Sequence, residues 1–155
     1  MGEELFFLTD EVVTEAMQRT IKMIEGFKNV DDYSSGDGYC ITFIGKDLII
    51  SDGMRDVGKF SSLSRKKAEM AKREKKDLID FIPNNPTRLR KGDNIFIGGI
   101  YSSQIKVAIG VAGFIEEVDD AIARHFLTEI KMICRIKYGE MVPKLKREGI
   151  FYLKK

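Results

Sequence analysis

The sequence predicts an α+β domain with a layered α-β-α arrangement, in which helices flank a mainly antiparallel sheet. Two segments are rich in apolar and β-branched residues and each is divided by a short turn, which is typical of a β-hairpin. Three other segments repeat apolar residues every three or four positions, as amphipathic helices do. The order helix, hairpin, helix, hairpin, helix lacks the strand-helix-strand crossovers that join parallel strands. The sheet is therefore expected to be antiparallel.

Composition favours one folded domain over residues 1–155. Hydrophobic residues make up 43% and charged residues 32% of the chain, with only three prolines, which is typical of a globular protein. The longest weakly polar run, "KVAIGVAGFI", is far shorter than the roughly 18 residues that a membrane helix needs. The start "MGEELFFLTDEVV" is acidic where a secretory signal is basic, and Cys40 and Cys134 lack CxxC spacing. We therefore expect reduced thiols and a cytoplasmic location.

The first helix and the first hairpin are expected before residue 54. Over residues 9–27, Thr9 or Asp10 is available as the N-cap and Glu11 lies in the first turn. The inward positions recur at intervals of three and four: Val13, Ala16, Met17, Thr20, Ile21, Ile24 and Phe27. After the polar loop "NVDDYSSGDG", the segment "YCITFIGKDLIISDG" contains two runs of aromatic and β-branched residues separated by residues 45–47. This pattern predicts a β-hairpin.

The second helix is expected to begin after Ser61 or Ser62 and to continue through "SSLSRKKAEMAKREKKDLIDF". Most of its charges face outward, and its inward positions are Leu63, Met70, Ala71 and Leu78. We expect it to end before "IPNNP", because proline lacks the backbone N–H that a helix interior needs.

The second hairpin is expected to pair residues 94–101 with residues 105–112 through a turn near "SSQ". Gly98 and Gly99 weaken its first strand, which indicates a bulge or the close approach of another group. A long helix follows from residue 116 to about residue 138, with one apolar stripe: Val118, Ala121, Ile122, Phe126, Ile130, Ile133 and Cys134. Pro143 is expected to break the helix, so that residues 143–155 form a C-terminal extension.

Charge is distributed unevenly, although the net charge is only +2. Residues 1–53 contain eleven Asp and Glu against four Lys and Arg, whereas two basic stretches occupy residues 64–77 and 131–149. One interpretation is a surface that binds a polyanion or a protein partner. The other is a solvated helix face, because Glu69 and Glu74 are spaced to pair with basic neighbours. No zinc-finger spacing or RNP-like motif accompanies the charge, so nucleic acid is not an expected partner.

The stretch "GVAGFIEEVDDAIARHF" joins a strand to the last helix and contains the chain's single histidine. Gly110 and Gly113 resemble a phosphate-binding loop, but neither a GxGxxG pattern nor a GK[ST] ending is present. Four carboxylates complement the helix dipole and favour neither a phosphate nor a metal site: Glu116, Glu117, Asp119 and Asp120. His125 falls at the edge of the apolar stripe, which favours a partly buried histidine over a metal or haem ligand. No catalytic residue is assigned, because no nucleophile motif is present.

A resemblance to a known family lies in three segments. "GGIYSSQIKVAIGVAGFIEEVDDAIARHFL" resembles the carboxy-terminal signature of the GlcG/HbpS family, and "LTDEVVTEAMQRTIKMIEG" and "DGMRDVGKFSSLSRKKAEMA" are similar to its earlier segments. This family includes the carboxy-terminal domain of PduO-type proteins and members described as haem- or corrinoid-binding. The resemblance implies a layered α-β-α domain with an antiparallel sheet of about five strands, assembled as a homo-oligomer. It also implies a tetrapyrrole or related cofactor at or near subunit surfaces.

The glycines of the signature have two interpretations. They serve the close packing of a helix on a strand, or they leave a groove beside Tyr101 and Phe114 that admits a flat apolar ligand. In the second interpretation the cofactor-binding residues are Gly98, Gly99, Tyr101, Gly113 and Phe114. Phe114 stands where the family commonly has a second glycine. An axial ligand would be a methionine, a tyrosine or absent.

Three hypotheses about function follow. The preferred one is an oligomeric protein that binds haem, a corrinoid or another planar cofactor, with no assigned reaction. The alternative is a regulatory or structural protein that binds a polyanion or a protein partner through its basic helices. The resemblance also implies an enzyme of glycolate or diol metabolism, for which the sequence offers no convincing acid-base pair.

Overall fold

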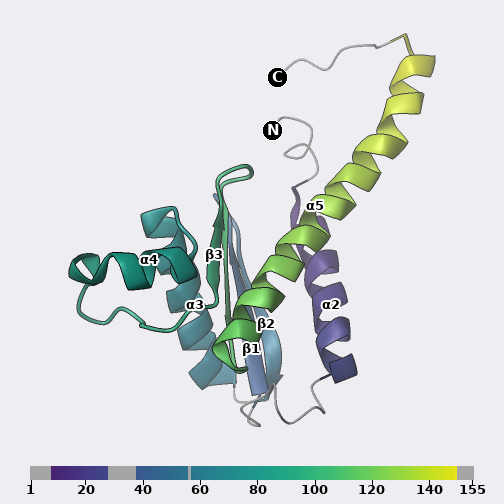
Figure 1. Cartoon of the computed structure of the whole chain (residues 1–155). Helices are drawn as coiled ribbons and strands as arrows, with labels where there is room; N and C mark the ends of the chain where they lie inside the picture. The colour runs from purple at the N-terminus through teal and green to yellow at the C-terminus, as the bar shows by residue number, and fades with distance from the viewer. Residues whose placement is uncertain (1–7, 28–37, 56, 150–155) are drawn as a thin grey trace.

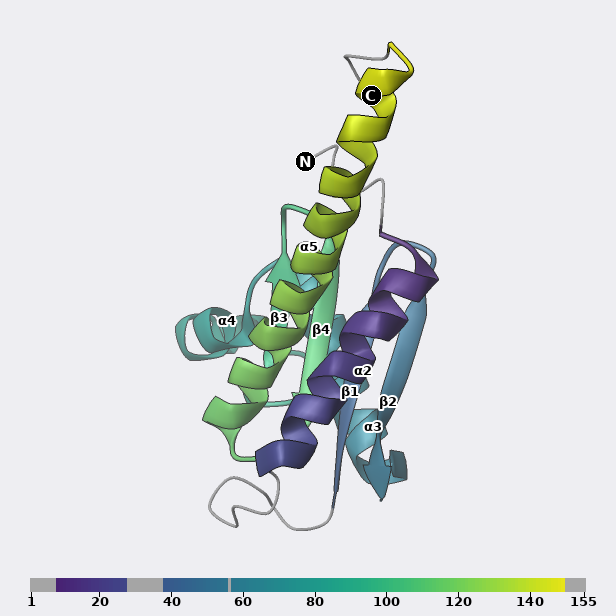
Figure 2. The same cartoon turned by 90° about the vertical axis from the view of Figure 1, so that its right-hand side faces the viewer.

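The computed structural model describes residues 8–27, 38–55 and 57–149, and the fold is given for these residues. The elements in chain order are α2 (Asp10–Phe27), β1 (Gly38–Ile44), β2 (Ile49–Arg55), α3 (Val57–Glu74), α4 (Leu78–Asn84), the 3-10 helix η2 (Pro86–Arg88), β3 (Gly99–Ser102), β4 (Val107–Ala112) and α5 (Glu116–Arg147). Figures 1 and 2 show α2 and α5 on one face of the sheet and α3 on the other, with α4 beside α3. The predicted α+β class, with helices flanking the sheet, is confirmed.

The sheet has the strand order β2-β1-β4-β3, and each neighbouring pair is antiparallel. Within the described residues it has four strands, so the expectation of five, which came from the family resemblance, is wrong. The segment before β3 stays outside the sheet because Asn94 folds it back on itself. The Asn94 Nδ2 atom donates to the Phe96 carbonyl at 2.8 Å, and its Oδ1 atom accepts from the Phe96 N–H at 2.7 Å. The strand predicted from residue 94 therefore begins only at Gly99.

Alternation along the strands sends side chains to the two faces of the sheet. Tyr39, Ile41 and Phe43 pack with residues of α2 and α5 in the larger core, whereas Ile44 packs with α3 and α4. Every residue of β4 is buried, because helices cover this central strand on both sides. Both predicted hairpins are confirmed, and β1 joins them by pairing with β4.

The helix α3 lies very close to β4 at Gly110. A Cβ atom at this position would lie 2.0 Å from the Ser64 carbonyl oxygen and 2.7 Å from the Ala68 backbone nitrogen. Both neighbours are backbone atoms of α3, which cannot move aside as a flexible side chain can. The absence of a side chain at Gly110 therefore sets the distance between this helix and the sheet.

The single helix expected over residues 61–81 is two helices. α3 begins earlier, at Val57, and ends at Glu74, after which Lys75 has a φ angle of 54° and turns the chain. α4 then continues through Pro83 to Asn84, although the sequence predicted an end before this proline. A proline near the end of a helix removes one intrahelical hydrogen bond, and the exposed end of α4 tolerates that loss.

The last helix is longer than predicted. α5 runs through Pro143 to Arg147, so the expected break at Pro143 is wrong. This half of the helix is exposed, and water can solvate the carbonyl of Gly139, four residues earlier, which loses its N–H partner. The proposed C-terminal extension is therefore helical up to Arg147, and the β-prone patch at residues 150–153 lies outside the described residues.

Two further expectations concern the environment of the protein. Both cysteines, Cys40 and Cys134, are buried thiols, as the sequence indicates. Among the described residues, no helix combines the length and the apolar character that crossing a membrane requires.

Candidate functional site

Three glycines meet where β3 begins and β4 ends, and we call Gly98, Gly99 and Gly113 the glycine junction. Gly98 has a φ angle of 114° and Gly113 one of 125°, a region that L side chains rarely adopt. The Gly98 carbonyl accepts a hydrogen bond from the Val111 N–H at 2.9 Å, which joins the two segments. A Cβ atom at Gly113 would lie 2.3 Å from the Gly38 carbonyl oxygen, so β1 also approaches closely.

The space beside Gly98 and Gly99 is filled from within the chain. A Cβ atom at Gly98 would lie 2.8 Å from the Asp119 Cβ atom and 3.0 Å from the Lys67 Nζ atom. A Cβ atom at Gly99 would lie 2.5 Å from the Lys67 carbonyl oxygen and 2.8 Å from a methyl group of Leu78. At these two glycines the structure supports the close-packing interpretation, because their open side faces α3 and α5.

The two aromatic residues of the hypothetical groove lie on opposite faces of the sheet. Phe114 is buried in the larger core, with its ring centroid 5.4 Å from that of Tyr39. Tyr101 is half-buried and packs against the smaller core on the other face, as Ile82 and Leu89 do. Its backbone N–H donates to the Asp77 Oδ1 atom at 2.9 Å. The structure thus brings Phe114 to the glycine junction but does not place Tyr101 opposite it.

A buried ion pair crosses the end of the sheet beside the glycine junction. The Lys67 Nζ atom of α3 donates to the Asp119 Oδ2 atom of α5 at 3.1 Å and to the Val111 carbonyl of β4 at 2.8 Å. The Asp119 Oδ1 atom accepts from the Phe114 N–H at 3.1 Å. The two side chains are only 1% and 3% exposed. The pair therefore ties two helices from opposite faces of the sheet to one strand end.

Burial dominates the electrostatics of this pair. It raises the pKa of Asp119 to about 7, against the opposing effects of the Lys67 ammonium and of the hydrogen bond from the Phe114 N–H. Both charged groups have hydrogen-bond partners within the chain. The arrangement is suited to fixing the start of α5, and with it the position of Phe114.

The sequence analysis did not identify this pair. It placed Lys67 among the charges of a solvated helix face and Asp119 among the acids that stabilise a helix start. A signal was nevertheless present, because Asp119 precedes Ile122 and Phe126 at the spacing of the apolar stripe. A charged residue at a core position of a helix indicates a buried partner.

The ionisation of Asp119 gives the stability of the protein a pH dependence. The pKa of about 7 in the folded protein lies above the ordinary value of 3.8 that applies to the unfolded chain. The folded state therefore holds this proton more tightly, and the resulting stabilisation is complete below about pH 4 and is lost as the pH rises through 7. We expect the free energy of unfolding of the wild type, measured relative to Asp119→Asn by urea denaturation, to fall across this range. A difference that stays constant with pH would contradict the assignment.

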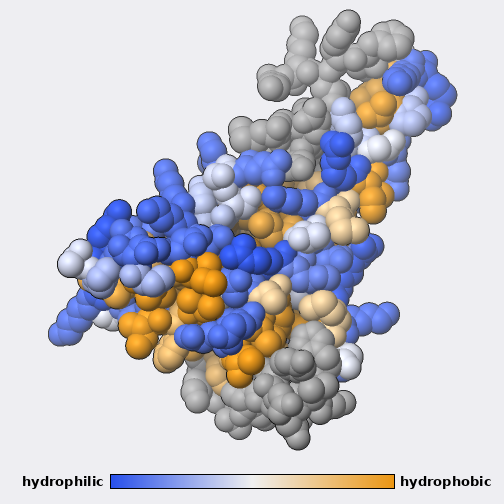
Figure 3. All heavy atoms as spheres, in the orientation of Figure 1, coloured by the Kyte–Doolittle hydropathy of each residue, from blue (hydrophilic) through white to orange (hydrophobic). Residues whose placement is uncertain are grey.

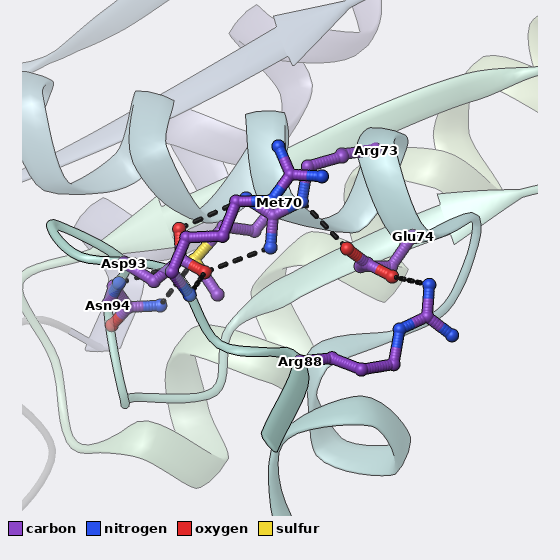
Figure 4. A network of polar contacts seen from close by, with 7 residues as sticks. Met70, Arg73, Glu74, Arg88, Asp93 and Asn94 are labelled. Atoms are coloured by element: carbon purple, nitrogen blue, oxygen red, sulfur yellow. Dashed lines mark hydrogen bonds and ion pairs between the residues drawn. The ribbon is translucent and has the colours of Figure 1, made fainter. Parts of the chain in front are cut away.

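Arg73, in the basic stretch of α3, takes part in a network of internal polar contacts, which Figure 4 shows. Arg73 binds both carboxylate oxygens of Asp93, at 3.0 and 2.9 Å. Glu74 accepts from Arg73 at 2.7 Å and from Arg88 at 2.6 Å. The hydrogen bonds from Arg73 hold the pKa values of Asp93 and Glu74 below their ordinary values. This network fixes the loop around η2 to α3, and the described contacts of α3 give no support to a polyanion site there.

His125 occupies the edge position that the sequence predicts. Its side chain is 36% exposed, and its Nε2 atom lies 3.6 Å from the Glu129 Oε1 atom on the same helix. Arg124, the residue before His125, pairs with Asp120 on the same helix. It also lies 3.1 Å from Asp77 and so joins α5 to the α3–α4 turn. Across the described ranges, no group of His, Cys, Asp or Glu side chains has a geometry that could hold a metal ion.

Exposed hydrophobic side chains lie close in sequence to the glycine junction. Ile95 is 64% exposed and Phe96 47% exposed in the loop before Gly98, and Ile115 is 45% exposed between Phe114 and α5. We call these three exposed residues, which flank the glycine junction in the sequence, the apolar patch. Figure 3 shows hydrophobic side chains gathered at the lower left of the molecule, around α4 and the loop that leads to β3. Because Asn94 fixes the backbone of Phe96, the loop presents Ile95 and Phe96 in an ordered conformation.

A small pocket lies at the other end of the sheet. It has a volume of about 220 Å³ and is lined by residues of the β1–β2 turn and the start of α2: Leu8, Asp10, Phe43, Gly45, Lys46, Asp47 and Leu48. This volume is below the usual range for sites that enclose a drug-sized ligand. None of the residues predicted to bind a cofactor lines it.

The fold is that of a known class of α+β domain. The chain is similar to a crystal structure of the Klebsiella pneumoniae protein ORFY, a DUF336 protein, with 17% identity, coverage of 76% of this chain and 87% of that chain, and a TM-score of 0.53. It is also similar to a crystal structure of a PduOC–heme complex, with 17% identity, coverage of 79% and 94%, and a TM-score of 0.57. Both structures have the fold of the GlcG-like family that the sequence resembles. No protein-family model and no curated protein matches the chain.

Proposed function

We propose that this protein binds a planar macrocyclic cofactor, such as haem or a corrinoid, as a homo-oligomer. The observation that carries the proposal is the fold, which it shares with a protein whose crystal structure is a PduOC–heme complex. The exposed side chains of the apolar patch support it, since large hydrophobic groups that gather on a surface often mark a binding site. The two buried thiols fit a reducing, cytoplasmic environment.

The residues at the apolar patch suit the faces of a macrocycle. Phe96 offers an aromatic ring and Ile95 and Ile115 offer aliphatic surface, which together would exclude water from one side of a flat ligand. Arg90 and Lys91 are exposed on the same loop and would meet the propionates of haem. When bound, the cofactor would supply a visible chromophore and its metal.

The residues that the sequence analysis predicted to bind a cofactor would then mainly support the site. Gly98, Gly99 and Gly113 would shape the backbone beneath the ligand, and Phe114 would support Ile115 from the core. Tyr101 would contribute only if a ligand also reached the other face of the sheet. The site as proposed is open on one side.

Titration of the protein with haemin tests this function. We expect a saturable change in the Soret absorbance for the wild type, and an affinity lowered roughly tenfold in Phe96→Ala because a large apolar contact is lost. Ile49→Ala is the matched control. Ile49 is 50% exposed, much like Phe96, and lies at the start of β2, at the end of the sheet away from the glycine junction. The same titration with a corrinoid distinguishes the two cofactor classes.

Two outcomes would overturn the proposal. A wild-type protein that shows no saturable spectral change with either compound does not bind these cofactors. An Ile49→Ala variant that loses as much affinity as Phe96→Ala would show that binding does not depend on the apolar patch.

A further inference from the structure

The C-terminal half of α5 extends beyond the rest of the domain (Figures 1 and 2). The last buried residue of this helix is Cys134, yet the helix continues to Arg147. An isolated helical segment of about a dozen residues is only marginally stable in water. This one also contains Gly139 and Pro143, which are the two least favourable residue types in a helix interior. Contacts with another surface would therefore stabilise it.

The outward face of this segment carries an uncharged stripe. Met132, Ile136, Gly139 and Pro143 follow one another at intervals of four, three and four, which is the spacing of a heptad seam. Met132 is 49% exposed and Ile136 is 52% exposed. A Cβ atom at Gly139 would meet nothing within 4 Å, so the surface is open there. On the helix this stripe lies opposite Ile130 and Cys134, which face the core.

Opposite charges flank the stripe. Arg135 lies on one side and Glu140 on the other, at the positions that a heptad assigns to g and e when Ile136 is an a position. Both residues are exposed. In a parallel pair of helices the g position of one chain faces the following e position of the other, so Arg135 and Glu140 would attract each other twice across a two-fold axis. The stripe is thus electrostatically complementary to a second copy of itself.

We propose that two copies of this chain associate through the outward face of α5, with the helices parallel and Met132 and Ile136 at the centre of the contact. The proposed function includes a homo-oligomer, and this contact is its proposed interface. The inference depends on that part of the proposed function and not on cofactor binding. The contact buries the exposed stripe and adds packing to a helix whose last buried residue, among those described, is Cys134. Gly139 allows the two backbones to approach closely.

Sedimentation velocity of the cofactor-free, full-length chain over a range of concentrations tests the contact. We expect the wild type to sediment as a dimer or a multiple of it, and Ile136→Glu to shift toward the monomer with a dissociation constant raised at least roughly tenfold. Ile49→Glu introduces the same charge at a residue of matched exposure and is expected to leave association unchanged. A monomeric wild type, or an Ile136→Glu variant that sediments as the wild type does, would overturn the proposal.

A charge exchange tests the orientation of the helices. Arg135→Glu and Glu140→Arg are each expected to weaken association, because each places like charges across the axis, and the double variant is expected to restore it. A double variant that is no better than the single ones would rule out the parallel arrangement. The haemin titration of Ile136→Glu separates the two proposals, since loss of the dimer with retained spectral change locates the cofactor on one subunit.

Discussion

Replacing Lys67 with methionine is expected to lower the free energy of unfolding by about 3–5 kcal/mol at about pH 8. The substitution leaves the Asp119 carboxylate buried without its cation and removes the donor to the Val111 carbonyl. The loss should be smaller at about pH 5, because Asp119, whose pKa is about 7, is protonated there. Urea denaturation at the two pH values measures both quantities.

Two further variants make this experiment specific. Lys66→Met changes the neighbouring residue, which is partly exposed, and is expected to alter stability by no more than about 0.5 kcal/mol. The double variant Lys67→Met with Asp119→Asn removes both charges and is expected to recover much of the lost stability. If Lys67→Met were as stable as Lys66→Met at about pH 8, the buried pair would not hold α3 and α5 together.

Apolar periodicity was sufficient to predict most of the fold. The first helix, expected over residues 9–27, is observed as Asp10–Phe27, and the Thr9 hydroxyl accepts from the Val12 N–H at 3.3 Å as an N-cap does. Both hairpins were predicted because their turns are local in sequence. The ends of the later helices were predicted less well, since exposed prolines at Pro83 and Pro143 are tolerated within them.

The candidate site depends on geometry that local patterns do not contain. Tyr101 pairs with Ala108, and continued strand alternation would place Phe114 on the same face as these two residues. The positive φ angle at Gly113 interrupts the alternation, and Phe114 joins the core on the opposite face. Whether a glycine adopts such an angle depends on what surrounds it, here the close approach of β1.

The buried ion pair between Lys67 and Asp119 was also not predicted, because it too depends on how the elements pack together. Lys67 lies in a run of basic residues, most of which are solvated or paired along the surface of α3. Its burial follows from the position of α3 against β4, and its partner is distant in the sequence at Asp119. A one-dimensional pattern can indicate that a charge lies on the inner face of a helix, but the partner is identified only when the helices are placed on the sheet.

The close approach of α3 to β4 leads to a second large expected effect. Gly110→Ala should lower the free energy of unfolding by about 3 kcal/mol, because the new methyl group would meet the Ser64 carbonyl at 2.0 Å. The neighbour is helix backbone, so relief requires α3 to move away from the sheet as a unit. That movement would also strain the Lys67 contacts to Val111 and Asp119. Thermal and urea unfolding of the variant measure the loss.

The same substitution in α2 separates this packing effect from the general effect of removing a glycine. Gly26 lies in a helix, and a Cβ atom there would meet nothing within 4 Å. Gly26→Ala is therefore expected to raise stability by about 0.5–1 kcal/mol, because alanine loses less backbone entropy on folding. Opposite signs for the two variants would show that a single backbone contact sets the spacing between α3 and the sheet. Equal effects would mean that α3 adjusts to the added methyl group, and that the glycine in β4 is not required for the fold.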